Sequence, residues 1–311
     1  EQVQLNAEGA SATITSVGDL TLRGGVITPG SNAQISVNAT GRDVRLERVG
    51  DSAVVPLSAL GRLRVEAQNI TQAGRVVAPF GQIDLVAQDQ LVLEDGSVTS
   101  VAARPGQVLL GGRLQNGVDW QLDGFNAVDA LPEKSVRLSG GEVAVQAGAR
   151  VDVSGGGDLL AYEFTAGPGG SRDILTDRNT YAILPGAQPG FAPGNVLEGS
   201  DRPAGEAVYL QGVPGLPDGV YTLLPAHYAL LPGALAVRLQ EGTPLLPNQA
   251  YTRQDGIRVA AGYVTDTRAG APRQGDWQAI EVLTRDQVRR RSEFTLANAS
   301  AFFADERNRT V

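Results

Sequence analysis

The chain contains no cysteine and no methionine, and it has one histidine, His227, and one lysine, Lys134. The absence of cysteine excludes disulfide bridges, thiolate nucleophiles and zinc sites with sulfur ligands. A single histidine excludes a histidine-rich metal centre, and we expect neither a metal nor another cofactor. Charged residues make up 19% of the chain, against a usual share of about 25%.

Positive charge is also scarce, because 34 Asp and Glu residues outnumber 26 Lys and Arg residues and give a formal net charge of −8. Without a basic field to hold phosphates, we expect no nucleic-acid partner. No run approaches the roughly 20 apolar residues of a membrane helix, so we expect no membrane insertion. The segment 1–4 lacks the basic start and apolar run of a signal peptide, and the chain has no initiator methionine; we therefore expect an interior piece of a longer protein.

Glycine is abundant, with 39 residues in 311, and it separates short alternations of apolar and polar residues in the first half. Such alternation predicts strands rather than helices. The clearest example is the segment 135–157, which reads SVRLSGG, EVAVQAG and ARVDVSGGG. Each of these three predicted strands places two apolar residues on one face: Val136 and Leu138, Val143 and Val145, and Val151 and Val153. Three such strands form a unit of about 20 residues, which is within the range of repeat lengths found in repeat proteins.

The same alternation of apolar and polar residues occurs upstream of this segment, at less regular intervals. Units begin at Leu63 and Ile83, 20 residues apart, and a further unit begins at Val108 after a longer interval of 25. Very short strands with glycine and asparagine at the corners predict a parallel β-helix over residues 1–157, in which turns stack at roughly 4.8 Å. The alternative is a sandwich of hairpins, which would favour Asn-Gly or Asp-Gly turns between longer strands.

The composition changes after Gly157. Most of the prolines lie between Asp158 and about Gly275. The same region contains a motif that occurs twice, as Tyr221-Thr-Leu-Leu-Pro and Tyr228-Ala-Leu-Leu-Pro. We expect residues 158–284 to form an antiparallel β accessory domain, and residues 285–311 to form a short helix and connector. The predicted strands are Val208–Gln211, Val220–Leu224, Tyr228–Leu231, Leu235–Gln240, Ile257–Thr265 and Gln278–Leu283.

Several segments resemble large bacterial exoproteins of the filamentous-haemagglutinin type, including an uncharacterised domain toward the C-terminal part of some of them. The segments are VDVSGGGDLLAYEF (151–164), GPGGSRDIL (167–175), YAILPG (181–186), GVPGLPDGVYTLLPAHYALLPGA (212–234) and RSEFTLANASAFFA (291–304). The resemblance covers residues 151–304, whereas residues 1–150 share only the character of solenoid repeats.

This resemblance implies an all-β chain with a right-handed parallel β-helix. It also implies two-partner secretion through an outer-membrane transporter, and an extracellular location on the bacterial cell surface. Proteins of this type act as surface fibres, adhesins or biofilm matrix. We therefore expect a structural segment of a fibrous adhesin or filament, with neighbouring turns of a longer parent chain, other copies of itself, or a host-surface or matrix glycan as partners.

The other hypothesis is a carbohydrate-active β-helix that binds or cleaves acidic polysaccharide. Paired carboxylates on an exposed face could act as general acid and base or bind calcium. The candidates are Asp84, Asp89, Glu94, Asp95, Asp152 and Asp158. None of these pairs has a diagnostic spacing, and outward strand positions are polar in any soluble fibre, so we expect no enzyme and no catalytic residues.

A Ser/His/Asp arrangement can be drawn from Ser171, His227 and Asp173, but no Gly-x-Ser-x-Gly elbow supports it. A lone histidine in a proline-rich β-domain is more often a turn or interface residue. Because aromatic residues gather in the accessory domain, we expect partner contact there. The predicted contact residues are Tyr221, His227, Tyr228, Tyr251 and Trp277.

Overall fold

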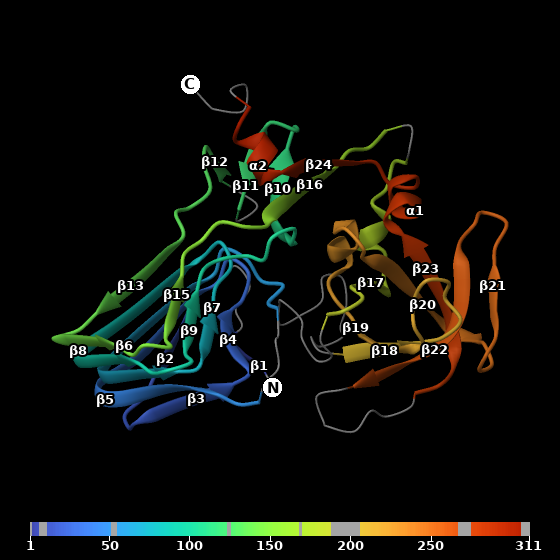
Figure 1. Cartoon of the computed structure of the whole chain (residues 1–311). Coiled ribbons are helices and arrows are strands. Elements are labelled where there is room, and N and C mark those ends of the chain that lie inside the picture. Colours follow the sequence, from blue (N-terminus) through green and yellow to red (C-terminus); the bar gives the residue numbers. More distant parts are fainter. Residues whose placement is uncertain are drawn as a thin grey trace. The chain divides into compact units, whose positions relative to one another are not determined.

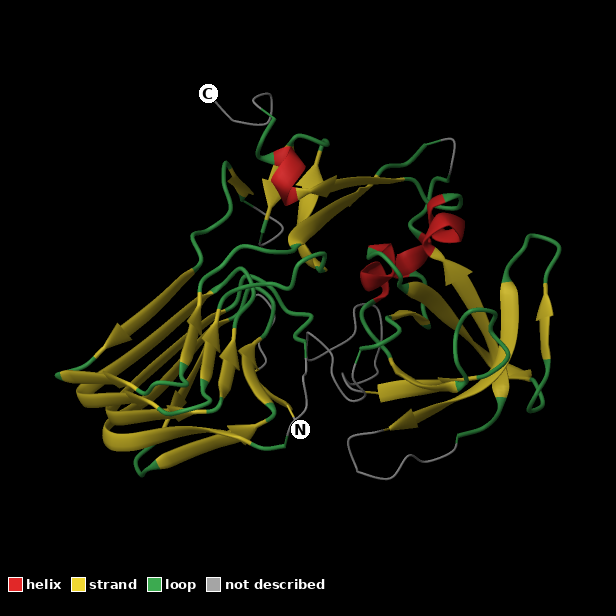
Figure 2. Ribbon diagram, viewed as in Figure 1, coloured by secondary structure: helices red, strands yellow, loops and turns green. Residues whose placement is uncertain are grey.

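A computed structural model describes residues 2–5, 11–50, 55–122, 126–167, 170–187, 206–266 and 275–305. The chain divides into two compact units (Figure 1). Unit 1 comprises Glu1–Ala161 and Ala297–Val311, and unit 2 comprises Tyr162–Leu296. Strands dominate both units and the helices are short, so the all-β class predicted from the sequence is confirmed (Figure 2).

Two sheets of unit 1 contain only parallel strand pairs. The first has the order β1-β4-β7-β9-β15, and the second has the order β13-β8-β6-β5-β2, with β3 paired to β5 and β14 to β8. The strands of the first sheet are Gln2–Leu5, Val26–Pro29, Arg75–Val77, Val98–Ser100 and Arg150–Asp152. Those of the second are Ser11–Thr15 (β2), Leu20–Gly24 (β3), Gln34–Arg48 (β5), Arg62–Ala73 (β6), Gln82–Leu93 (β8), Ser135–Ser139 (β13) and Glu142–Val145 (β14).

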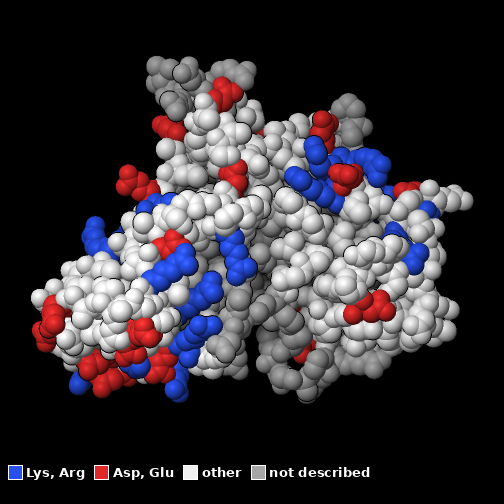
Figure 3. All heavy atoms as spheres, in the orientation of Figure 1, with Lys and Arg blue, Asp and Glu red and all other residues white. Residues whose placement is uncertain are grey.

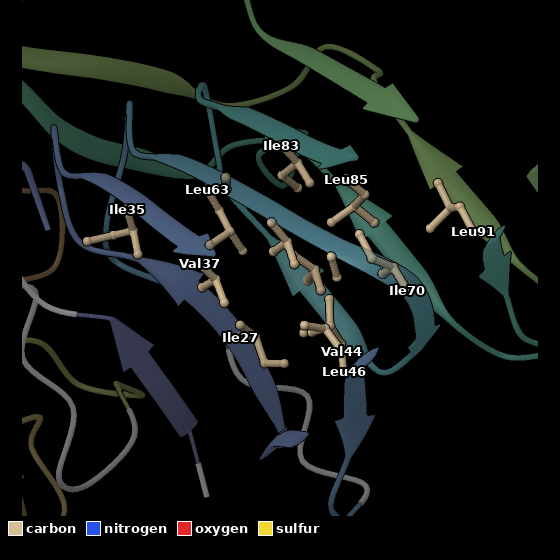
Figure 4. Close-up of a cluster of buried hydrophobic side chains, with 14 of the residues drawn as sticks. Ile27, Ile35, Val37, Val44, Leu46, Leu63, Ile70, Ile83, Leu85 and Leu91 are labelled. Atoms are coloured by element: carbon tan, nitrogen blue, oxygen red, sulfur yellow. The ribbon is translucent and has the colours of Figure 1, made fainter. Parts of the chain in front are cut away.

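The strand register of the second sheet places side chains from successive passes of the chain in columns. The four apolar columns are Ala12-Ile35-Leu63-Ile83-Val136, Ile14-Val37-Val65-Leu85-Leu138, Leu20-Val44-Ile70-Leu91-Val143 and Leu22-Leu46-Gln72-Leu93-Val145. Their central members are almost fully buried and form one core (Figure 4). Because burying one such side chain contributes about 1.5–3 kcal/mol, these columns are the main source of stability in unit 1.

One polar residue, Gln72, lies within these columns and is fully buried. Its side-chain carbonyl accepts the N–H of Gly74 at 2.9 Å, and its amide nitrogen lies within donating distance of the carbonyl oxygen of Val98, 3.0 Å away. A buried amide costs little when its donors and acceptors are satisfied, so Gln72 joins the second sheet to the first without disrupting the core.

A second ladder, made of polar residues, follows one corner of the sheet: Asp19, Asp43, Asn69, Gln90 and Glu142. Each residue hydrogen bonds to the next. Asp19 accepts the backbone N–H of Asp43, and Asp43 accepts the side-chain amide of Asn69. Asn69 accepts the N–H of Gln90, whose side chain donates to Glu142. The corner is therefore built from side-chain-to-neighbour bonds rather than from glycine alone.

The unit predicted to begin at Val108 is not part of this parallel ladder. Strand β10 (Val108–Gln115) pairs antiparallel with β11 (Asp119–Gln121), which pairs antiparallel with β12 (Ala127–Val128). The prediction failed because the tight turn Asn116-Gly117, with both residues at positive φ, folds the chain back as a hairpin. The strands that follow β8 and β9 in the parallel sheets are β13, β14 and β15.

The hairpin belongs to a third sheet, with the order β12-β11-β10-β16-β24. Strands β16 (Asp158–Phe164) and β24 (Phe294–Asn298) carry the chain between the two units. After β24, the short helix α2 (Ala299–Phe302) places Phe302 5.4 Å from the fully buried ring of Trp120, measured between ring centroids. A short helix near the C-terminal end is thus present.

Unit 2 contains an antiparallel sheet with the order β17-β20-β23-β22-β18-β19, and β21 pairs with β22. The strands are Thr180–Ile183 (β17), Glu206–Leu210 (β18), Gly219–Thr222 (β19), Leu235–Pro244 (β20), Ala250–Thr252 (β21), Arg258–Asp266 (β22) and Gln278–Thr284 (β23). The short helix α1 (Arg285–Arg289) follows β23. Five of the six predicted strands are present, whereas β17 and β21 were missed.

The strand predicted at Tyr228–Leu231 is wrong, because Ala226–Leu230 forms the 3-10 helix η2. Within this segment the N–H of Tyr228 donates to the carbonyl of Pro225, and the N–H of Leu231 donates to the carbonyl of Tyr228. The backbone donors are satisfied locally, so the segment does not need a neighbouring strand.

Candidate functional site

The five residues predicted for partner contact all belong to unit 2, but they differ in exposure. Tyr251 on β21 is 50% exposed, whereas His227 and Tyr228 on η2 are 6% and 2% exposed. Tyr221 on β19 is partly buried, and its hydroxyl donates to the carbonyl of Pro217. The structure therefore places His227 and Tyr228 in the interior, and Tyr251 is the most accessible of the tyrosines in this set.

His227 lies among residues from three other elements of unit 2. Its Nε2 is 2.9 Å from Oδ2 of Asp173, the N-cap of the 3-10 helix η1 (Ile174–Thr176). Its ring stacks on Tyr162 of β16 at 4.6 Å and meets Phe294 of β24 edge-on at 6.4 Å. This arrangement holds η2 against the turn at Asp173 and against the strands that lead to unit 1 in the chain.

The turn at Asp173 is itself held by hydrogen bonds. The other carboxylate oxygen of Asp173 accepts the N–H of Leu175, and the hydroxyl of the fully buried Ser292 bonds the N–H of Ile174 and the carbonyl of Arg172. Ser171 has an exposed side chain at a bend, whereas His227 is buried. The structure thus joins the histidine and the aspartate as a buried pair between two short 3-10 helices, whereas the sequence predicted a turn or interface residue at His227.

A second aromatic cluster lies on β18, β22 and the residue that precedes β23, and the sequence identified only its tryptophan. Tyr209 and Tyr263 are directly opposite each other on antiparallel strands, with ring centroids 4.9 Å apart and planes 12° apart. Trp277 meets both rings edge-on, at 5.8 Å from Tyr209 and 5.0 Å from Tyr263. All three side chains are partly exposed. Such rings offer apolar faces and polar tips that suit a sugar ligand.

Five of the six candidate carboxylates of unit 1 bind partners within the chain. Asp84 is 3% exposed and lies 2.6 Å from a guanidinium nitrogen of Arg62, and Glu94 makes two bonds of 3.0 Å to Arg45. The remaining pairings are Asp89 with Gln68, the N–H of Asp95 with Gln146, Asp152 with Ser154 and Arg150, and Asp158 with Ser300. Within the described residues no group of three or more His, Asp and Glu side chains could hold a metal ion.

Basic side chains gather on unit 1 over β7, β9 and β15, a local feature that the net charge did not indicate (Figure 3). Burial lowers the pKa of Arg75, and the nearby guanidinium groups of Arg104, Arg48 and Arg150 lower it further. Arg150 is paired with Asp152 at 2.7 Å. The cluster is thus a local positive region that carboxylates of the same unit partly compensate.

Comparison with protein-family models, curated proteins and solved structures finds no match to this chain. Among the residues that the structure describes, no helix is long and apolar enough to cross a membrane.

Proposed function

We propose that the chain is a structural segment of a secreted fibre on the bacterial cell surface, of the filamentous-haemagglutinin type. In this proposal unit 1 is a right-handed parallel β-helical stalk, and unit 2 is an accessory domain for adhesion, biofilm formation or self-assembly. The observation that carries the proposal is the set of parallel ladders, whose four side-chain columns each continue through five strand positions.

Stacked parallel strands suit a mechanical role for a physical reason. Every turn shares backbone hydrogen bonds and apolar contacts with the turns on both sides, so the stack resists bending and local opening. Three of the candidate carboxylates, Asp84, Glu94 and Asp152, are paired with arginines, which fits a structural role better than catalysis. Secretion by an outer-membrane transporter enters the proposal from the sequence resemblance alone.

The test is the location and size of the native protein. Antibodies raised against unit 2 would be applied to intact source cells, to permeabilised cells and to shed material, followed by blotting. The proposal expects labelling of intact cells and a band much larger than a chain of 311 residues. Labelling only after permeabilisation would refute the surface role, and a surface species of about 311 residues would refute the long fibre.

A second candidate function is glycan binding by the accessory domain, favoured by the cluster of Tyr209, Tyr263 and Trp277. Acidic oligosaccharides titrated into the purified chain should give a binding signal in isothermal titration calorimetry, and Trp277→Ala should abolish it. Tyr251→Ala is the matched control, because Tyr251 is exposed on β21 of the same unit and is not one of the three rings. Equal binding by the parent and Trp277→Ala would exclude this cluster.

A further inference from the structure

Two buried polar side chains flank the aromatic cluster of Tyr209, Tyr263 and Trp277. Thr265 on β22 is 3% exposed, and Gln211, which directly follows β18, is 7% exposed. Among the described residues, the hydroxyl oxygen of Thr265 and the side-chain amide nitrogen of Gln211 are buried without a hydrogen-bond partner. Buried polar atoms in folded proteins nearly always have such a partner, so two exceptions beside one cluster of rings need a physical explanation.

The strand register places both polar groups on the face of the sheet that carries the tyrosines. Tyr263 lies opposite Tyr209 in the antiparallel pair of β22 and β18, and the N–H of Gln211 continues the pairing by donating to the carbonyl of Ala261. Because side chains alternate between the faces of a strand, Thr265 shares a face with Tyr263, and Gln211 shares it with Tyr209. The strands run in opposite directions, so Thr265 and Gln211 lie at opposite ends of the tyrosine pair. The other face of both strands packs in the apolar core of unit 2.

The chemistry of the three rings and the two polar groups fits a sugar ring. A sugar ring has a face of C–H groups, which packs on aromatic rings, and hydroxyl groups at its rim, which form directional hydrogen bonds. The hydroxyl of Thr265 can donate and accept, as a sugar hydroxyl does, and the amide nitrogen of Gln211 donates. None of these five side chains carries a charge. A site built from them therefore binds the ring and the hydroxyls of a ligand rather than a carboxylate.

We propose that Thr265 and Gln211 are the hydrogen-bonding residues of a glycan site on the aromatic cluster, and that this site recognises sugar hydroxyl groups independently of the ligand's charge. The inference rests on the glycan-binding function proposed above and specifies the chemistry of that site. A proline-rich peptide also packs on Trp and Tyr rings, but at proline its backbone offers only an acceptor, whereas the Thr265 hydroxyl can donate and accept. Binding turns the two side chains toward the ligand, a rotamer change of a kind that is common at binding sites.

The two unpaired groups should lower the stability of the free protein. Burial of a hydroxyl without a partner costs its desolvation energy, and the hydrogen bond that offsets this cost forms only when the ligand is present. Thr265→Val retains the branched shape and removes the hydroxyl. We therefore expect a midpoint of thermal unfolding equal to or above that of the parent, together with weaker binding. A threonine with a purely structural role would give a lower midpoint and unchanged binding.

The experiment applies the purified full chain to an array of acidic oligosaccharides, each printed beside the same oligosaccharide with its carboxyl groups reduced to alcohols. Isothermal titration calorimetry then measures the best ligand in both forms. The parent should bind the acidic and the reduced form with equal dissociation constants. Thr265→Val and Gln211→Met should each weaken the binding of both forms about threefold to tenfold, the size expected for one lost hydrogen bond.

Thr180→Val is the matched control for Thr265→Val. Thr180 is 5% exposed on β17 of the same sheet, and its hydroxyl accepts a hydrogen bond from Nε of Arg238 at 3.4 Å. Because this hydroxyl has a partner in the free protein, its removal should lower the midpoint of thermal unfolding and leave the affinity for the ligand unchanged.

The possible outcomes separate this inference from the function on which it rests. Unchanged affinity of Thr265→Val and Gln211→Met, where Trp277→Ala abolishes binding, would overturn the inference and leave the glycan-binding function intact. Binding of the acidic forms alone would also overturn it, because recognition would then depend on the charge of the ligand. A parent that binds no oligosaccharide, or binds only a polyproline peptide printed on the same array, would refute the glycan-binding function together with the inference.

Discussion

In unit 2, Nε2 of His227 lies 2.9 Å from the carboxylate of Asp173, a residue 54 positions away in the sequence. The side chains of both residues are largely buried, at 7% and 11% exposure. The pair joins the 3-10 helix η2 to the turn that begins η1, and the stacked ring of Tyr162 fixes the plane of the imidazole. The only histidine of the chain therefore has a structural position.

We expect His227→Ala to lower the free energy of unfolding of unit 2 by about 1–3 kcal/mol, because it leaves a buried carboxylate without its partner. The measurement is urea unfolding of the full chain followed by near-ultraviolet circular dichroism. Tyr251→Ala is the control, since Tyr251 is half exposed and its loss should change the stability by no more than about 0.5 kcal/mol. Equal unfolding midpoints for the two variants would show that the pair contributes nothing.

Two valines of one column provide a test of the parallel ladder. Val44 on β5 is 1% exposed and Val143 on β14 is 42% exposed, yet both belong to the column that begins at Leu20. Val44→Ala should cost about 1.5–3 kcal/mol through lost burial and the cavity that remains. Val143→Ala should cost less than about 0.5 kcal/mol in dilute solution. Thermal unfolding of both variants measures the difference, and equal losses would contradict the burial gradient along the column.

The sequence predicted the parts of the fold that depend on local pattern. The three strands predicted within Ser135–Gly157 are present as β13, β14 and β15. They could be predicted because the alternation of apolar and polar residues and the glycines at the corners are local features of the sequence. The predictions failed where the structure of a segment depends on which strand it pairs with or on the residues of a tight turn. The hairpin at Asn116-Gly117 removed Val108 from the parallel ladder, and local hydrogen bonds made a 3-10 helix of the segment around Tyr228.

Residues of the candidate sites were harder to predict for a related reason. Trp277 was identified as a single aromatic residue, but its partners Tyr209 and Tyr263 lie on two other strands and are brought to it only by the antiparallel register. The basic region around Arg75 was missed because net charge averages over the whole chain. Both features depend on contacts between distant segments, which a single sequence does not show.

Close stacking of corners makes one glycine position sensitive to any side chain. A Cβ atom built on Gly81 would lie 1.9 Å from the carbonyl oxygen of Gly61, which accepts the N–H of Gln82. Gly81→Ala should therefore force the two corners apart and cost about 1–3 kcal/mol or more. Gly18→Ala is the control, because a Cβ at Gly18 meets no atom within 4 Å. Unfolding in urea compares the two variants, and a neutral Gly81→Ala would mean that the corners are not in contact.

Asp152 on β15 gives unit 1 a dependence on pH in the acid range. The hydroxyl and N–H of Ser154 lower the pKa of the Asp152 carboxyl below its ordinary value, and Arg150 adds to the effect. A lowered pKa in the folded state means that the ionised carboxylate stabilises the fold. This contribution is complete above the ordinary carboxyl pKa of about 4 and is lost as the pH falls through the lower folded-state value.

Asp152→Asn removes that contribution, so it should be less stable than the parent at pH 7 by about 0.5–1 kcal/mol, the size expected for an accessible hydrogen-bonded ion pair. The deficit should shrink when both proteins are melted at pH 3, because the parent loses its own contribution there. Glu133→Gln, which removes an exposed carboxylate from the same unit, is the control for the general effect of losing one negative charge. A deficit of equal size at pH 7 and pH 3 would show that Asp152 acts through its shape and hydrogen bonds rather than through its charge.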